Sequence, residues 1–125
     1  MDSPTPAGVV GRYRKAWTQR LKPGMAAEYQ AAHGAIWPEV LAMFYAAGIK
    51  QFVIYLLPPD QLFLYAEFDD QAAWDSIPAQ DACKRWWKEM ERFVDFKAGG
   101  AGEANVPDAT ALDEMWYLAA STSKR

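Results

Sequence analysis

The sequence contains one cysteine and one histidine among its 125 residues, and no apolar run of the length that crosses a membrane. Cys83 has no partner for an internal disulfide, and one histidine cannot complete a zinc site of cysteines and histidines. A membrane-spanning helix needs roughly 20 predominantly apolar residues. These shortages exclude a disulfide-stapled scaffold, a Cys/His zinc site and a transmembrane segment, and they favour a reduced, cytoplasmic protein.

Positive charge is also scarce: 13 basic residues face 16 acidic ones, giving a net charge of −3. A nucleic-acid partner would require a dominant basic face, so such a partner is not expected. The glycine-rich stretch 99–102 follows a predicted helix and lacks the strand–turn–helix context of a nucleotide-binding loop. The sequence therefore predicts neither a nucleotide cofactor nor a metal.

The residues that are present indicate one folded domain. Apolar residues make up 51% of the chain and aromatic residues 14%, which excludes general disorder. We expect a loose N-terminal arm at 1–11, a single domain at 12–119 and a loose tail at 120–125. Hydrophobic periodicity and turn residues predict the elements within that domain. The expected strands are 13–21, 49–57, 62–68 and 113–119; the expected helices are 25–32, 38–47, a short one at 74–77 capped by Asp69 or Asp70, and 81–96; the segment 97–111 is expected to be an irregular, mobile loop.

This order of elements predicts an α+β fold, a split βαβ arrangement with a four-stranded antiparallel sheet and helices on one face. In strands 49–57 and 62–68 both alternating sets of residues are largely hydrophobic, so the uncovered face of the sheet should also be apolar. Two such sheets packed face to face would bury that surface. A homodimer with a barrel-like centre is therefore expected.

The stretch from Glu28 to Glu39 contains the histidine of the chain, one helical turn after a tyrosine. Residues four apart lie on one face of a helix, so Tyr29 and His33 should project side by side. Histidine can both give and take a proton near neutral pH, which makes His33 a candidate general acid or base. Gly34 and the Trp37–Pro38 pair should interrupt the helix just after His33, placing the imidazole beside a cleft.

Aromatic residues supply the other candidates for a binding site. Trp86 and Trp87 are adjacent and point about 100° apart around a helix, so one of them should reach beyond the helix–sheet interface. An indole can stack on the C–H face of a sugar, although both could equally be core aromatics. Tyr55 could offer a hydroxyl to a pocket. Tyr29 could bind a polar ligand or orient His33, or be an ordinary half-buried tyrosine.

Several of these segments together resemble the L-rhamnose mutarotase family. They are Arg14-Lys15-Ala16, Glu28-Tyr29-Gln30, His33 with Ile36-Trp37-Pro38-Glu39, Ile54-Tyr55-Leu56, and Cys83 to Met90 with its Arg-Trp-Trp-Lys core. The resemblance implies a dimeric ferredoxin-like fold and a cofactor-free isomerase that interconverts the α and β anomers of a 6-deoxy-L-sugar. By position it implies that His33 is the proton donor, Tyr29 a sugar ligand, and Trp86 and Trp87 the aromatic wall of the sugar site.

Two positions depart from the family pattern. Phe52 stands where the family usually has a second ligand tyrosine, and Gly34 where asparagine commonly follows the histidine. The loss of a hydroxyl at Phe52 leaves open whether L-rhamnose, L-fucose or another sugar is preferred. The group that accepts the anomeric hydroxyl proton is also open. Two other functions remain possible on such a fold: a cofactor-free monooxygenase, or a sugar-binding module without catalysis.

Overall fold

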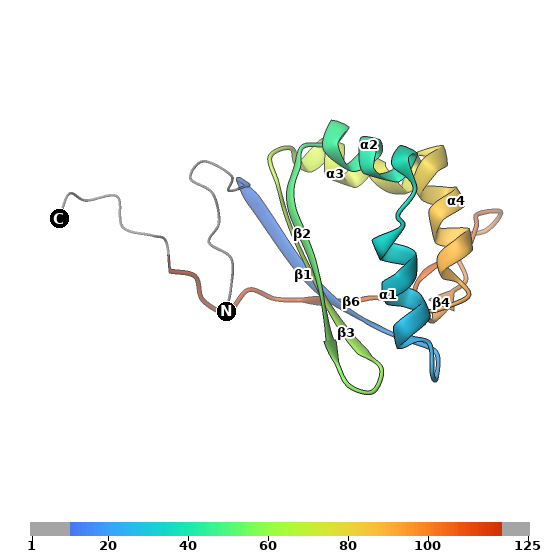
Figure 1. Cartoon of the computed structure of the whole chain (residues 1–125). Coiled ribbons are helices and arrows are strands. Elements are labelled where there is room, and N and C mark those ends of the chain that lie inside the picture. The colour runs from blue at the N-terminus through green and yellow to red at the C-terminus, as the bar shows by residue number, and fades with distance from the viewer. Residues whose placement is uncertain (1–10, 119–125) are drawn as a thin grey trace.

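A four-stranded antiparallel sheet in the order β2–β3–β1–β6 forms one layer, and the helices cover one of its faces (Figure 1). The computed structural model describes residues 11–118; the expected tail at 120–125 and all but Gly11 of the expected arm lie outside that range. The elements are β1 (Tyr13–Arg20), α1 (Ala26–Gly34), α2 (Pro38–Ala46), β2 (Ile49–Leu57), β3 (Gln61–Phe68), α3 (Gln71–Ser76), the 3₁₀ turn η1 (Ile77–Ala79), α4 (Asp81–Met90), β4 (Phe96–Lys97), β5 (Val106–Pro107) and β6 (Thr110–Leu112).

The strand register determines which side chains face the helices. In β3, Leu62, Leu64, Ala66 and Phe68 are buried, and the residues between them are more exposed. Trp17 of β1 lies opposite Leu64, and Ile54 of β2 lies opposite the same residue, so all three share the helix-covered face. The alternation predicted for the strand at 62–68 is confirmed by the burial of β3. In β2, burial does not alternate and the register shifts between Ile49 and Gln51, although the pairing beyond the shift keeps the predicted faces.

Two glycines with positive φ stand in the turns that separate helices from strands. Gly24 has a φ of 77° in the turn between β1 and α1, and Gly48 has a φ of 78° where α2 gives way to β2. Such positive φ values cost little for glycine and are strained for residues with a Cβ. Asp70 caps α3 by accepting a hydrogen bond from the Ala73 N–H at 3.1 Å, as the sequence predicted.

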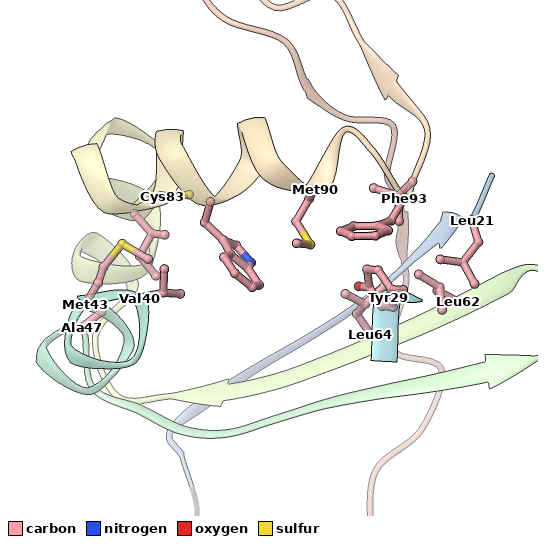
Figure 2. Close-up of a cluster of buried hydrophobic side chains, with 13 residues drawn as sticks. Leu21, Tyr29, Val40, Met43, Ala47, Leu62, Leu64, Cys83, Met90 and Phe93 are labelled. Carbon is pink, nitrogen blue, oxygen red and sulfur yellow. The ribbon is translucent and has the colours of Figure 1, made fainter. Parts of the chain in front are cut away.

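The core lies between the sheet and the helices. Figure 2 shows Tyr29 of α1, Met90 of α4 and Leu64 of β3 facing the same interior. No polar or charged side chain is buried among the described residues. Cys83 belongs to this core and is 2% exposed, and its burial raises the pKa of the thiol to about 12. It therefore acts as a small apolar residue of the core.

Three predicted boundaries were wrong. Helix α4 ends at Met90 and not near residue 96, because the following backbone bonds to β1 and its continuation: Lys22 N–H donates to Phe93 O and Asp95 N–H to Arg20 O. The segment 97–111 is not wholly irregular, since Lys97 of β4 pairs with Val106 of β5 and β6 begins at Thr110. Gly11 is no part of a loose arm, since its N–H donates to Glu67 Oε1 at 3.0 Å.

The last strand also lies earlier than predicted. Strand β6 covers Thr110–Leu112 and pairs with residues 16–18 of β1, whereas the sequence favoured 113–119. Beyond β6 the backbone no longer pairs with β1; instead Glu114 forms an ion pair with Arg14, whose guanidinium lies 3.6 Å from the centre of the Tyr117 ring. Trp116 is left 75% exposed. The residues that follow β6 do favour β-structure, but within residues 11–118 no strand pairs with them.

No helix among residues 11–118 combines the length and apolar character that a bilayer crossing requires.

Candidate active site

His33 lies in the last turn of α1, immediately before the chain breaks toward α2. The helix ends at Gly34, and Trp37 adopts an extended conformation that lets Pro38 occupy the first position of α2. Proline suits that position because its missing N–H would have no helical partner there. The predicted interruption is confirmed, and the imidazole stands at the junction of two helices.

A hydrogen bond to the backbone indicates which ring nitrogen of His33 carries the proton. Its Nδ1 lies 3.0 Å from the backbone oxygen of Tyr29, one turn earlier in the helix. A carbonyl oxygen can only accept, so Nδ1 carries the proton and Nε2 of the neutral ring has a free lone pair. Burial lowers the pKa of His33, and the bond to Tyr29 offsets this only in part. The neutral imidazole, with Nε2 available as a base, is therefore the form favoured near pH 7.

Tyr29 contacts His33 through its ring and its backbone. The two ring centres are 4.4 Å apart, and the Phe93 ring approaches Tyr29 edge-on at 6.3 Å. Tyr29 is 7% exposed, and burial raises the pKa of its hydroxyl, which stays protonated. That hydroxyl bonds to none of the described residues, and none of their side-chain polar atoms is both sealed and unpaired. The Tyr29 hydroxyl therefore faces a cavity, described below, that this residue helps to line.

The two tryptophans of α4 occupy different environments, as their spacing predicted. Trp86 is 6% exposed; its ring lies 5.5 Å from His33 and 5.1 Å from Trp37, edge-on to both. Trp87 is half-buried and lines the same cavity. Because the Trp86 N–H has no partner among the described residues and is not sealed, it too can donate to a molecule in the cavity.

A cavity of about 1240 Å³ joins these residues between the helix layer and the sheet. Its sheet side is mainly aromatic and aliphatic: Trp17 packs edge-on against Phe52 at 5.6 Å and against Trp74 at 5.7 Å. The volume exceeds that of a monosaccharide, and the apolar walls with a few polar groups are typical of a small-molecule site. Tyr29, His33, Phe52, Trp86 and Trp87 all line this one cavity.

Tyr55 does not join the cluster around His33. It borders the cavity, but its register places it opposite Phe63, on the face of the sheet away from the helices, and it is 63% exposed. Phe52 is three residues earlier and on the other face, so the two predicted ligands of β2 point in opposite directions. The alternation of side chains along β2 already contained this information.

Trp17 lines the cavity, although no sequence motif indicated it as a site residue. Its ring contacts both Phe52 and Trp74, so it links β1, β2 and α3 beneath the helices. The alternation of Lys15, Trp17 and Gln19 was the available signal, because these residues share one face of β1. Which face the helices cover could not be read from β1 by itself.

An ion-pair network connects the two helices that flank the imidazole. Arg85 of α4 donates from Nη1 to Glu39 of α2 at 2.8 Å, and from Nε to Asp81 at 2.8 Å. The guanidinium holds the pKa of Glu39 below its usual value. Glu39 and Asp81 thus share one arginine, next to the contact between Trp37 and Trp86.

Neither the cavity nor the rest of the described chain brings together three or more acidic, histidine or cysteine side chains that could hold a metal ion. Among the residues described above, the polar groups on this cavity are the imidazole, the Tyr29 hydroxyl and the indole N–H groups.

Comparison with known proteins identifies the family. A family model described as L-rhamnose mutarotase matches residues 14–118. The chain belongs to the L-rhamnose mutarotase family. It is 34% identical over 107 residues to the L-rhamnose mutarotase of Klebsiella pneumoniae, covering 85% of this chain and 98% of that protein. It is 33% identical over 106 residues to the Shigella flexneri protein of the same name, covering 84% and 97%.

Solved structures support the fold. A crystal structure of an L-rhamnose mutarotase from Formosa agariphila matches with a TM-score of 0.70 at 19% identity, covering 86% of this chain and 99% of that chain. A dimeric ferredoxin-like protein from an uncultured marine organism matches with a TM-score of 0.51 at 10% identity, covering 85% and 91%. The ferredoxin-like α+β fold and the family predicted from the sequence are confirmed.

Proposed function

We propose that this protein is a mutarotase that interconverts the α and β anomers of L-rhamnose or a related 6-deoxy-L-sugar. The single observation that carries the proposal is the His33 imidazole: its Nδ1 is occupied by the Tyr29 carbonyl, and it lines a cavity shared with two indoles. The family membership supplies the reaction. The geometry supplies a group that can perform it.

The reaction requires two proton transfers at oxygens bound to the same carbon. Nε2 of neutral His33 accepts the proton of the anomeric hydroxyl while the bond between C1 and the ring oxygen breaks, and the imidazolium delivers a proton to that ring oxygen. The open-chain aldehyde then rotates about its C1–C2 bond and closes on its other face by the reverse steps. A positioned acid–base group contributes about 10² to 10⁴-fold, which is sufficient for a reaction that already proceeds in water.

The aromatic residues hold the sugar during these steps. The C–H face of a pyranose stacks on an indole of Trp86 or Trp87, and the indole N–H and the Tyr29 hydroxyl can donate to sugar oxygens. Phe52 offers a ring and no hydroxyl to the cavity floor. The 6-methyl group of a deoxy sugar fits such an apolar surface, because no polar atom of the ligand would be left unpaired there.

The test is saturation-transfer NMR of anomer exchange with the purified protein, using L-rhamnose, L-fucose and their common epimers. The proposal expects catalysed exchange of at least one 6-deoxy-L-sugar, and preference for L-fucose would make the protein an L-fucose mutarotase. Sugar binding without faster exchange would instead indicate a binding module. Oxygen consumption with an aromatic substrate, and no exchange of any sugar, would indicate a monooxygenase.

We also propose that the protein acts as a homodimer in the cytoplasm. The helices leave one face of the sheet uncovered (Figure 1), and large apolar side chains there are exposed. Tyr55 and Phe63 lie opposite each other on that face, and Leu112 of β6 lies opposite Ala16 on the same face. A second copy would remove this surface from water, whereas a monomer would expose it. The low cysteine content supports the cytoplasmic location.

A further inference from the structure

The floor of the cavity contains one half-buried polar side chain that neither the sequence motifs nor the mechanism above uses. Gln19 of β1 lies opposite Leu62, on the face covered by the helices, two residues from Trp17. Lys15 is the other polar residue that β1 contributes to the cavity lining, and Lys15 is exposed. Gln19 is therefore the half-buried polar side chain of a floor that is apolar apart from exposed Lys15.

The side-chain amide of Gln19 is free to bind a ligand. It makes no hydrogen bond to any described residue, although glutamine offers two donors and an acceptor. The amides of Gln51, Gln61 and Gln71 each donate to a neighbour: to Glu67, to the Gln19 backbone oxygen, and to Asp75. Gln30 also lines the cavity with an amide that bonds to no described residue, but Gln30 lies on α1 and is exposed. The bond from Gln61 holds the backbone of Gln19 and leaves its side chain available.

The register determines toward which space the Gln19 side chain points. Gln19 borders the large cavity and also a smaller hollow of about 290 Å³ that includes Thr18 and Arg20. Thr18 and Arg20 alternate with Gln19 along β1 and so project to the opposite face. The side chain of Gln19 accordingly belongs to the large cavity, and its backbone borders the smaller one.

The position of Gln19 relative to the catalytic group suits a contact with substrate. Its partner Leu62 belongs to the same buried cluster as Tyr29 (Figure 2), and Tyr29 packs against His33. A sugar that stacks on the indoles of α4 presents its edge hydroxyls to the sheet. An apolar floor cannot satisfy those hydroxyls, and burying one without a partner is costly.

We propose that Gln19 is a further substrate-contacting residue, whose amide binds one ring hydroxyl of the sugar from the sheet side and so helps to select which epimer is accepted. This inference rests on the proposed mutarotase function. Phe52 provides no hydroxyl on the same floor, so Gln19 supplies the polar contact there. A sugar that lacks the matching hydroxyl leaves the amide unpaired and is disfavoured.

The experiment compares wild type with Gln19→Met, which keeps the length of the side chain and removes the amide. The matched control is Gln80→Met, because Gln80 is half-buried, makes no side-chain cap bond and lies outside the cavity lining. Anomer exchange is measured by NMR with L-rhamnose and its 2-, 3- and 4-deoxy analogues. Gln19→Met is expected to lose roughly 3- to 10-fold in kcat/KM for L-rhamnose, mainly through KM, with Gln80→Met unchanged.

The analogues distinguish a contact from a general disturbance. For the one analogue that lacks the hydroxyl bound by Gln19, wild type and Gln19→Met should have equal kcat/KM, because the contact is absent from both. If Gln19→Met loses the same factor in kcat/KM with every analogue, or loses nothing with any sugar, the inference is overturned. Gln19→Glu, which keeps an acceptor and loses the donors, provides a second variant if Gln19→Met fails a thermal-melt check of folding.

A failure of the proposed function would look different. If wild type binds these sugars without accelerating exchange, the mutarotase function fails, and the ratio of dissociation constants between wild type and Gln19→Met then decides the role of Gln19. If wild type neither binds nor converts any of them, both proposals are overturned.

Discussion

A main-chain oxygen decides which nitrogen of His33 is available for chemistry. The sequence placed Tyr29 and His33 on one helix face, and this neighbourhood is confirmed. It could not show that the orienting group is the carbonyl of Tyr29 and not its hydroxyl, because that depends on the rotamer of the imidazole. Spacing predicts neighbours, whereas hydrogen-bond partners require coordinates.

The rate should therefore depend on pH with a defined sign. Burial disfavours the imidazolium, so the pKa of His33 lies below its usual value near 6.5. If neutral Nε2 is the base, kcat/KM should be constant from neutral pH upward and fall on acidification below that usual value. NMR exchange rates from pH 5 to 8, corrected for the uncatalysed reaction, would measure this. A rate that rises as the pH falls would contradict it.

Trp86 and Trp87 should respond differently to truncation. Trp86→Ala removes a core indole and is expected to reduce the free energy of unfolding by about 3 to 5 kcal/mol. Trp87 is half-buried, so Trp87→Ala should cost less stability and raise the KM for the sugar by about 3- to 10-fold. Urea unfolding and exchange kinetics on both variants test this. Equal losses of stability would show that the two indoles are not divided between core and site.

At the scale of elements, the sequence correctly predicted the helices and strands in which the hydrophobic periodicity agrees with the proline and glycine residues at the ends. Pro38 and Gly48 bound α2, and β3 alternates clearly between buried and more exposed residues. It failed where the partner strand decides the outcome. Helix α4 stops at Met90 because the backbone that follows pairs with β1, and β6 is confined to the three residues that meet residues 16–18. Such long-range pairing leaves no local signature.

The ion pair between Glu39 of α2 and Arg85 of α4 should affect sugar binding with little effect on the stability of the fold. Glu39 and Arg85 are exposed, so their attraction is weak and screened by salt. Arg85→Met is expected to change KM by less than about fivefold through looser placement of Trp86, with little further change when 1 M salt is added. The double variant Glu39→Arg with Arg85→Glu should recover part of the loss. Measuring KM at low and high salt for wild type and both variants would test this. A wild-type KM that does not change with salt would contradict it.

At the scale of the whole molecule, we expect a dimer because large apolar side chains are exposed on the uncovered face of the sheet. Phe63→Glu places a charge on that face opposite Tyr55 and is expected to shift the protein from dimer to monomer. Tyr45→Glu is the matched control, since Tyr45 is 74% exposed on α2, away from the sheet. Light scattering coupled to size-exclusion chromatography measures the mass. A monomeric wild type, or a Phe63→Glu variant that remains dimeric, would contradict the proposed interface.

If His33 catalyses anomer exchange inside the indole-lined cavity, its removal should abolish the exchange and leave a folded protein. Saturation-transfer NMR is run on L-rhamnose, and on whichever 6-deoxy-L-sugar wild type converts best, with wild type and His33→Ala at equal concentration. Circular dichroism and sugar-binding measurements confirm that the variant is folded and still binds. His33→Ala is expected to exchange anomers at or near the uncatalysed rate, a loss of about 10² to 10⁴-fold. Exchange at the wild-type rate by folded His33→Ala would contradict it.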